Sequence, residues 1–426
     1  MPTISPFKGL RYNTSVISDI SKVVAPPYDI IYDEWREMLY ERHPNNIVRL
    51  IKSKSQSDDD EINNKYTRAR DHINSWMSEG VLILDEKPSI YVRSDTYKVG
   101  GETKTRYGFI SLIKLEDFGK GIHPHEKTLS APKVDRLNLI KETKTNLSQI
   151  FSIYSDTDNK IQDILLKVAA KSPVADFTDE QDIHRKIWIV DDEETISEMQ
   201  SIMKDREVII ADGHHRYETS LAYKEFMEPL RKSEDEPFDY VSMYFSSADD
   251  MGMTILPTHR KVGGLETFDE KKMFEALEKD FDITYYDNVE LDEMLNLIKD
   301  DSERTNVFGI YTVNGYAVAK LKNPSEPKRL DVELLHTDII EKILGITPEE
   351  TAKGKYLHFC KSPDHAYDEV ASGKDQVSFF MNAIVPEELF RVVLNGKRMP
   401  QKSTYFYPKT MSGLVMYKVE KESFNK

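Results

Sequence analysis

Alternating strand and helix patterns in the middle of the chain constrain its fold most strongly. Apolar, β-rich runs at 186–190 and 208–211 predict strands, and the stretches 193–204 and 217–227 predict helices. This strand–helix–strand–helix order is typical of helices that pack against a sheet. It therefore favours an α/β chain of the mixed α+β kind over an all-helical one.

The second of these strands runs into the sequence Asp212-Gly213-His214-His215-Arg216, where the following helix is expected to begin. A glycine lets the backbone approach a ligand closely, and the first N–H groups of a helix favour negative charge. Arg216 adds a planar fork suited to phosphate oxygens, and the histidines add donors. The segment predicts a phosphate site, most simply for a nucleotide. The alternative is a plain turn whose basic residues cap the helix or pair with Asp212 and Glu218.

Length and charge limit the remaining choices. The 426 residues predict two or three domains, and 31% charged residues fit a globular protein. A net charge of −16 and a pI of about 5.3 argue against nucleic acid as a partner. No run reaches the roughly 18 apolar residues of a membrane span, and the first residues lack signal-peptide features, so we expect a cytoplasmic protein. Cys360 is the single cysteine and is expected to be a small buried hydrophobe.

Composition and turn signals predict three parts along the chain. We expect an N-terminal α+β portion over 1–118, a core with the chemically suggestive motifs over 119–262, and a C-terminal α+β region over 263–426 that closes over the site. Two turns predict hairpins, at Gly100-Gly101 and at Asn314-Gly315.

A second motif, His123-Pro124-His125-Glu126, precedes the Asp-Gly-His-His-Arg segment. A positioned carboxylate such as Glu126 can act as a general base towards a hydroxyl or bind a phosphate-bound Mg²⁺. The alternative is a polar surface loop. On ligand type alone, His123 and His125 could also form a zinc site with His214 and His215.

A third candidate is the basic and aromatic segment 396–409, which contains Arg398, Lys402 and Lys409. It could close over a phosphate or stack a base, or it could be an edge strand that uses lysines against self-pairing. The sequence Thr258-His259-Arg260 is a weaker candidate of the same type. The common nucleotide-binding and hydrolase motifs are missing from the sequence, so a nucleotide would bind outside the commonest frameworks.

Six motifs, in order, resemble the domain-of-unknown-function family numbered 1015, and the likeness runs nearly from end to end. They are Pro6-Phe7-Lys8-Gly9-Leu10-Arg11-Tyr12, Ala25-Pro26-Pro27-Tyr28-Asp29, His125-Glu126, Asp135-Arg136-Leu137, Ala211-Asp212-Gly213-His214-His215-Arg216-Tyr217 and Lys402-Ser403-Thr404-Tyr405-Phe406-Tyr407-Pro408-Lys409.

The Asp-Gly-His-His-Arg segment also resembles, over roughly a hundred residues, the phosphate-binding motif of the ParB/sulfiredoxin superfamily. Within it, the segment is most similar to the free L-serine kinases, which use ADP or ATP to make O-phosphoserine. The resemblance implies a ParB/sulfiredoxin-like core, with Glu126 as catalytic base and Asp212 to Arg216 as phosphate cradle. The chain departs from those kinases because 86 residues separate Glu126 from Asp212, and because its C-terminal half has no counterpart in them.

These observations lead to an expected function. We expect a cytoplasmic kinase that uses ATP or ADP, with Mg²⁺, to phosphorylate a small hydroxyl substrate such as free L-serine. The alternative is a nucleotide-responsive ParB-like regulatory or scaffold protein without turnover, and a third option is a metal-dependent hydrolase. The nucleotide, the acceptor and the oligomeric state stay open. Further candidates to bind substrate or support the site are His123, His125, Asp135, Arg136, Arg398, Lys402 and Lys409.

Overall fold

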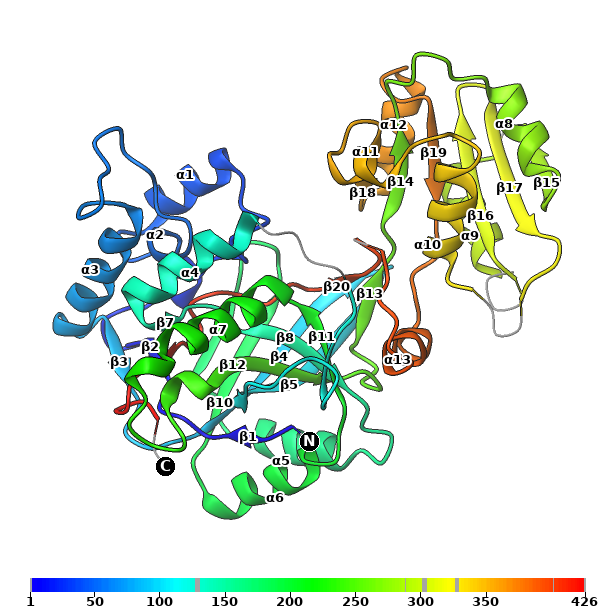
Figure 1. Ribbon diagram of the computed structural model, residues 1–426. Helices are drawn as coiled ribbons and strands as arrows, with labels where there is room; N and C mark the ends of the chain where they lie inside the picture. The colour runs from blue at the N-terminus through cyan, green and yellow to red at the C-terminus, as the bar shows by residue number, and fades with distance from the viewer. Residues whose placement is uncertain are drawn as a thin grey trace. The chain divides into compact units, whose positions relative to one another are not determined.

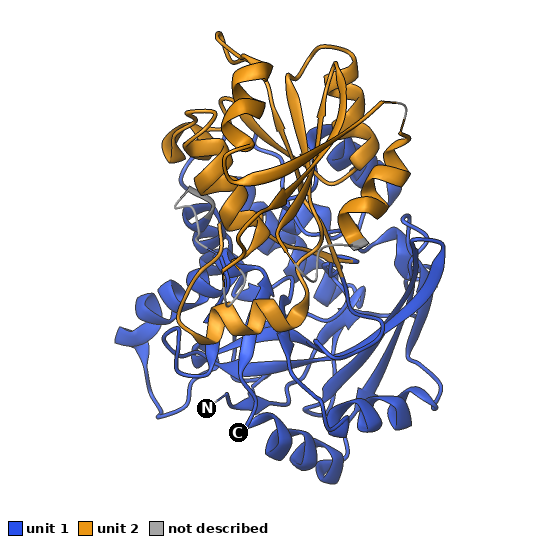
Figure 2. Cartoon of the chain, turned by 90° about the vertical axis from the view of Figure 1, so that its right-hand side faces the viewer, with its two compact units in different colours: residues 1–254, 408–426 blue, residues 255–407 orange. Residues whose placement is uncertain are grey.

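The structure is a computed structural model that describes residues 2–126, 131–287, 289–300, 305–325, 329–400 and 402–424 (Figure 1). Its helices and sheets confirm the expected mixed α+β class. The chain forms two compact units, residues 1–254 with 408–426 (unit 1) and residues 255–407 (unit 2), coloured separately in Figure 2.

The units group the chain differently from the three expected parts. Strands from 90–114 and from 184–247 pair within one sheet, so residues 1–118 and 119–254 share a core. Unit 2 starts near the expected break at 262, but the last residues of the chain return to unit 1. Hydrogen bonding between distant segments, which composition does not reveal, decides this grouping.

Unit 1 is built on a sheet that is nine-stranded over its described residues. Along the main path the order is β6-β11-β8-β12-β5-β4-β10-β9, and β1 pairs with β5. Two pairs, β6 with β11 and β8 with β12, are parallel, and the other pairs are antiparallel. In chain order the strands are β1 (Ile4–Ser5), β4 (Ile90–Val99), β5 (Glu102–Lys114), β6 (Ile122–Pro124), β8 (Ile150–Tyr154), β9 (Ala175–Thr178), β10 (His184–Val190), β11 (Val208–Asp212) and β12 (Tyr240–Ser247).

The predicted Gly100-Gly101 turn is confirmed, and it joins the two long strands β4 and β5. Val99 pairs with Glu102, and both glycines have positive φ, of 58° and 80°. Only glycine adopts such angles at low cost, so the strands hold a tight two-residue hairpin.

Helices α5 (Lys160–Ala169) and α6 (Glu193–Met203) pack on this sheet. Their apolar side chains, including Leu165 and Met199, join those of alternate strand residues such as Val92 and Phe109 in one buried cluster. Since successive strand residues point to opposite faces, Tyr91, Arg93 and Asp95 lie on the other face of β4.

A second core of unit 1 lies around the N-terminal helices. Trp76, Ile73 and Leu50 contribute to it, together with Met416 from the C-terminal end. The helices around this core are α1 (Asp33–Arg42), α2 (Val48–Ile51), α3 (Lys65–Ser78) and α4 (Ala131–Thr143), and a 3-10 turn, η1, spans Ile20–Lys22. Helix α7 (His214–Met227) packs against α4, and its Tyr217 belongs to the first cluster. Two small sheets tie this part together, β2 (Leu10–Tyr12) with β3 (Leu82–Leu84) and β7 (Thr145–Asn146) with β21 (Tyr417–Lys418).

Two further 3-10 turns of unit 1 are η2 (Glu228–Leu230) and η3 (Pro237–Asp239). They lie between α7 and β12. Arg231 pairs there with Asp239 and Glu228. Burial acts to raise the pKa of Asp239, but its bonds to Arg231 and Lys224 outweigh burial and hold that pKa below its usual range.

Unit 2 contains a six-stranded antiparallel sheet in the order β15-β17-β16-β19-β14-β18 over its described residues. The predicted Asn314-Gly315 hairpin is confirmed, because Thr312 pairs with Gly315 between β16 and β17. The strands of the sheet are β14 (His259–Val262), β15 (Phe281–Tyr286), β16 (Val307–Thr312), β17 (Gly315–Leu321), β18 (Leu357–Cys360) and β19 (Val377–Phe380). The helices are α8 (Glu270–Leu277), α9 (Leu291–Asp300), α10 (Asp331–Leu334), η4 (Leu335–Glu341), α11 (Pro348–Ala352), α12 (Pro363–Ala371) and α13 (Pro386–Leu394). The short strands β13 (Thr254–Leu256) and β20 (Tyr405–Tyr407) form a further pair.

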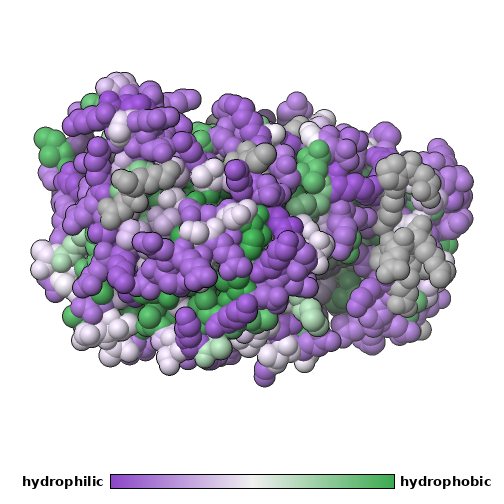
Figure 3. All heavy atoms as spheres, turned by 90° about the horizontal axis from the view of Figure 1, so that it is seen from below, coloured by the Kyte–Doolittle hydropathy of each residue, from purple (hydrophilic) through white to green (hydrophobic). Residues whose placement is uncertain are grey.

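The surface is mostly polar on the face seen in Figure 3, as expected for a chain with 31% charged residues. Within the described ranges, no helix has the length and apolar character needed to cross a membrane. Cys360 is buried, as predicted.

A buried cluster of charges lies within the sheet of unit 1. Asp95 on β4 stands directly opposite Arg106 on β5 and Arg185 on β10, and all three side chains are fully buried. Arg93, two residues before Asp95, is the third cation, at 2.9 Å. Burial acts to raise the pKa of Asp95, but the three guanidinium groups outweigh it and hold that pKa well below its usual range.

We expect Asp95→Asn to destabilise unit 1 strongly, because three buried guanidinium groups would lose their shared carboxylate. The expected loss is about 3–5 kcal/mol of unfolding free energy. All three tryptophans, Trp35, Trp76 and Trp188, belong to unit 1, so urea unfolding followed by tryptophan fluorescence measures this loss. Asp71→Asn, which removes an exposed partner of Arg70, is the matched control and should leave the midpoint nearly unchanged. Equal effects of the two substitutions would contradict the role given to Asp95.

Candidate functional site

Parallel pairing of two short strands brings the two predicted motifs to one edge of the sheet. β6 and β11 run in the same direction, with His123 beside Ile209 and Pro124 beside Ile210. Carboxyl ends of parallel strands lie side by side, so His125 and Glu126 leave the sheet next to Asp212 and the start of α7. The distance of 86 positions in sequence from Glu126 to Asp212 therefore does not separate the motifs in space.

Contacts between the histidines confirm that the motifs meet. The His125 backbone N–H donates to His214 Nε2 at 3.2 Å, and the two rings lie 4.7 Å apart. His125 Nδ1 lies 2.6 Å from the Ile210 carbonyl oxygen, so this nitrogen carries a proton. Its other nitrogen, Nε2, lies 3.4 Å from Glu126 Oε1. A carboxylate beside an imidazole is an arrangement that can accept and pass on a proton.

Gly213 makes the sharp bend between β11 and α7. Its φ is 94°, in the left-handed region that suits glycine, and as N-cap it offers no side chain to the helix. A Cβ added here would lie 2.8 Å from Arg216 Nε, because the guanidinium covers the backbone at this point. The φ thus favours glycine here, and a Cβ would in addition make the Arg216 guanidinium shift from its place.

Arg216 and Lys409 surround the Asp212 carboxylate. Lys409 Nζ lies 3.2 Å and Arg216 Nη2 lies 3.6 Å from Asp212 Oδ2, and Arg216 Nη1 also donates to the Gln149 carbonyl oxygen. Burial acts to raise the pKa of Asp212, but Lys409 and Arg216 outweigh it, so this pKa lies below its usual range. Because two cations pair with one partly exposed carboxylate, these three side chains together carry a net positive charge.

His214 is held neutral in this environment. Burial, helped by the nearby His125, lowers its pKa to about 3, although Glu126 and Asp212 act in the opposite direction. The hydrogen bond from His125 N–H requires a lone pair on Nε2, which agrees with a neutral ring.

The second pair of candidates, Asp135 and Arg136 on α4, lies in the same unit. Arg136 and Arg216 line one narrow hollow, together with Tyr28. Asp135 accepts from Lys65 and Tyr66, and neighbouring cations lower its pKa to about 2 against the opposing effect of burial. The Asp135-Arg136 pair therefore borders the candidate site without entering the β11–α7 bend.

The other predicted residues divide between the bend itself, the rest of unit 1 and unit 2. His123 Nε2 pairs with Glu207 at 2.6 Å, and His215 is partly exposed in the first turn of α7. Arg398 and Lys402 belong to unit 2, where both are exposed. Thr258, His259 and Arg260 are also in unit 2 and are buried. Over the part of the chain that is described, no three or more His, Cys, Asp or Glu residues gather as metal ligands do.

Several residues near the site gave no clear signal in the sequence. Gln149 contributes only a backbone carbonyl, and Tyr217 fixes α7 by donating from its hydroxyl to the Glu116 carbonyl at 2.7 Å. Tyr28, which lines the hollow, belongs to a motif noted for the family resemblance but was given no role. Lys52 and Lys65 stood in polar stretches that resemble ordinary solvated surface.

The fold and the site define a mixed α+β protein with a basic bend between a strand and a helix. The chain belongs to the family described as "Protein of unknown function (DUF1015)", whose model matches residues 4–334. This confirms the family predicted from the six motifs, although the last motif, 402–409, lies beyond the matched residues. None of the curated proteins matches this chain.

A search of solved structures finds similarity to a mutant free serine kinase in complex with ADP, with a TM-score of 0.36 and 13% identity over 70% of this chain and 87% of that one. A conserved hypothetical protein from Pyrococcus furiosus aligns with a TM-score of 0.35 and 14% identity, over 71% of this chain and 92% of that one. SbnI with a C-terminal truncation, from Staphylococcus aureus, aligns with a TM-score of 0.34 and 10% identity, over 72% of this chain and 86% of that one.

We expect Gly213→Ala to destabilise unit 1 more than a glycine-to-alanine substitution at a site with positive φ where the new Cβ meets no other atom. The matched control is Gly80→Ala, after α3, where φ is 71° and a new Cβ meets nothing within 4 Å. The control should lose about 1–2 kcal/mol from its left-handed backbone. Gly213→Ala should lose more, because Arg216 must also move. Urea unfolding followed by tryptophan fluorescence measures both, and a smaller loss at Gly213 would refute the close packing of Arg216.

Buried His214 also predicts a pH dependence of stability. Its folded pKa of about 3 lies below the usual 6.5, so only the unfolded chain gains a proton as pH falls through 6.5. Stability should therefore fall from pH 6.5 towards pH 3, approaching about 1.4 kcal/mol per pH unit for this residue.

His214→Gln tests this dependence, because its amide oxygen can accept from His125 N–H but does not titrate. Between pH 7.5 and 5, the unfolding midpoint of unit 1 should shift less in this variant than in the wild type. His358→Gln, at an exposed position in unit 2, is the control and should keep the wild-type shift. An unchanged shift in His214→Gln would show that His214 is not the group responsible.

Proposed function

We propose that the chain is a small-molecule kinase that transfers a phosphoryl group from ATP or ADP to a hydroxyl group. In this proposal, Asp212 to Arg216 hold the nucleotide phosphates, and Glu126 acts as base. The acceptor suggested by the motif resemblance is free L-serine. The observation that carries the proposal is the parallel pairing of β6 with β11, which brings Glu126 and His125 next to the β11–α7 bend.

The bend has the features of a phosphate site. α7 begins there with a glycine N-cap, and its first hydrogen bonds run from the Arg216 and Tyr217 N–H groups to the Gly213 carbonyl. The positive end of the helix dipole at this point favours negative charge. Arg216 and Lys409 add two cations. A guanidinium has five N–H donors, so the contacts with Gln149 and Asp212 leave donors for phosphate oxygens.

The reaction then follows from the position of Glu126, whose side chain is partly exposed. The acceptor oxygen attacks the terminal phosphorus, the new O–P bond forms, and the bond to the bridging oxygen breaks, which leaves ADP from ATP or AMP from ADP. Glu126 takes the hydroxyl proton, and His125 beside it can help to orient the carboxylate. Such transfer depends mainly on positioning and charge neutralisation, which the bend offers.

Mg²⁺ fits this proposal as a companion of the nucleotide. It prefers oxygen ligands and usually binds through one or two carboxylates together with phosphates. Glu126 and Asp212 are the carboxylates at this edge that could hold it. When bound, the ion would neutralise phosphate charge.

The test is an assay of phosphate transfer from ATP or ADP to L-serine, together with calorimetric titration of ADP. We expect Glu126→Gln to lower turnover by about 10²–10⁴-fold while ADP still binds, because the base contributes to the chemical step. Arg216→Ala should weaken ADP binding. Glu225→Gln, at an exposed site on α7, is the control and should keep both properties.

Each outcome decides between the candidate functions. Turnover that is unchanged in Glu126→Gln removes its role as base. ADP binding that depends on Arg216, without turnover on any hydroxyl acceptor, favours the nucleotide-responsive regulatory protein. If neither ATP nor ADP binds to the wild type, the proposal is overturned.

A further inference from the structure

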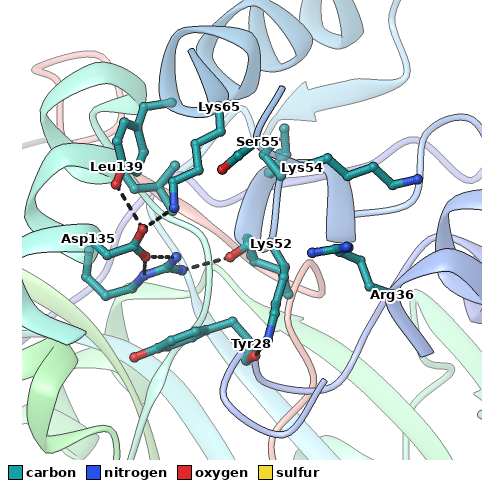
Figure 4. A pocket seen from close by; sticks show the side chains of 13 residues that line it. Tyr28, Arg36, Lys52, Lys54, Ser55, Lys65, Asp135 and Leu139 are labelled. Atoms are coloured by element: carbon teal, nitrogen blue, oxygen red, sulfur yellow. Dashed lines mark hydrogen bonds and ion pairs between the residues drawn. The ribbon is translucent and has the colours of Figure 1, made fainter. Parts of the chain in front are cut away.

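A cavity of about 500 Å³ lies beside the N-terminal helices of unit 1, in the size range of small-molecule sites. Residues from α2, α3 and α4 line it, and Figure 4 shows Lys65 and Asp135 on one side, Arg36 on the other and Lys52 between them. No residue of the β11–α7 bend lines this cavity. Tyr28 and Arg136 line this cavity and also the narrow hollow that Arg216 lines.

The lining of this cavity is strongly basic in a chain that carries a net charge of −16. Its five cations are Arg36, Lys52, Lys54, Lys65 and Arg136.

Carboxylates neutralise only part of this charge. Asp135 pairs with Lys65 and Arg136, Glu37 pairs with Lys54 and Arg36, and Asp33 also pairs with Arg36. Five cations therefore face three carboxylates. These ion pairs therefore leave a net positive charge in the lining of the cavity.

Lys52 is the cation that these carboxylates do not pair. It ends α2, and its ammonium donates to the backbone carbonyls of Tyr28, at 3.1 Å, and of Ile31. An ammonium has three donors, so these two bonds leave one. Burial lowers the pKa of Lys52, and Asp33 and Asp29 oppose this only through longer-range attraction. No carboxylate of the described ranges lies within ion-pair distance of it.

The rest of the lining suits a small polar ligand. Ser53 and Ser55 supply hydroxyl groups, and Leu50, Ile51 and Leu139 supply an apolar wall. The Arg136 guanidinium stacks on the Tyr28 ring at 4.0 Å and donates to the Ile51 carbonyl, so it is held in place beforehand. A pre-positioned guanidinium next to a lysine recognises an anion at low entropic cost.

We propose that this cavity is a binding site for a small molecule with more than one negative charge, such as a phosphate ester or a polycarboxylate. Lys52 provides the central ammonium, and Lys65, Arg136 and Arg36 provide the surrounding charge. The site exists whether or not the bend transfers phosphate.

The test is calorimetric titration of the full chain with inorganic pyrophosphate and with citrate at constant ionic strength, with neutral glycerol as the negative probe. We expect at least one of the two anions to bind the wild type. Lys52→Met should weaken that binding about tenfold or more, because it removes the central charge. Lys98→Met removes the same charge at an exposed position on β4 and should bind like the wild type.

A second variant covers the case in which Lys52→Met unfolds, since Lys52 also supports two backbone carbonyls. Arg36→Met with Lys65→Met removes two cavity cations and leaves the Lys52 bonds in place, and it should weaken binding similarly. Arg216→Ala distinguishes anion binding in this cavity from anion binding at the bend, and this variant should still bind the anion. Binding that is lost in Arg216→Ala but retained in Lys52→Met assigns the anion to the bend and overturns the proposal, as does absence of binding by both anions.

Discussion

The parallel pairing of β6 with β11 is the constraint on which the candidate site depends. Both strands are short, and β6 lies at the edge of the sheet, so only a few hydrogen bonds fix their register. That register places His125 against Ile210 and against the ring of His214. A slip of one residue would turn every side chain of β6 to the opposite face and would separate Glu126 from the bend.

Unit 1 contains two carboxylates that are each surrounded by cations, and these ion pairs fix the position of each carboxylate. Asp95 is enclosed by three arginines within the sheet, and Asp212 is flanked by Arg216 and Lys409 at its edge. In both, cations overcome the effect of burial on the carboxylate. The difference lies in exposure: Asp95 is sealed and can serve only the fold, whereas Asp212 reaches the surface, where the surrounding cations can meet a ligand.

The return of the C-terminal end to unit 1 links distant parts of the chain. Tyr417 and Lys418 pair with β7, Met416 packs among the N-terminal helices, and Lys409 reaches Asp212. A segment that follows the whole of unit 2 thus completes both the core and the charge balance of the site. The basic segment 396–409, predicted as one candidate, is divided accordingly, with Lys409 at the bend and Arg398 in the other unit.

Local patterns in the chain were enough to predict the mixed α+β class, the two hairpins, the strand–glycine–helix bend and the family. The structural features among these depend on residues that are close in sequence, such as Gly213 with its left-handed φ, or Gly100 beside Gly101, and the family depends on short motifs, each of them local. Contacts across long separations needed the tertiary structure. The meeting of His125 with His214, the pairing of Lys409 with Asp212 and the gathering of Lys52, Lys65 and Arg136 around one cavity all depend on strand pairing and helix packing. A lysine in a polar stretch looks the same in the sequence whether it faces water or a cavity, because its neighbours in space come from other segments.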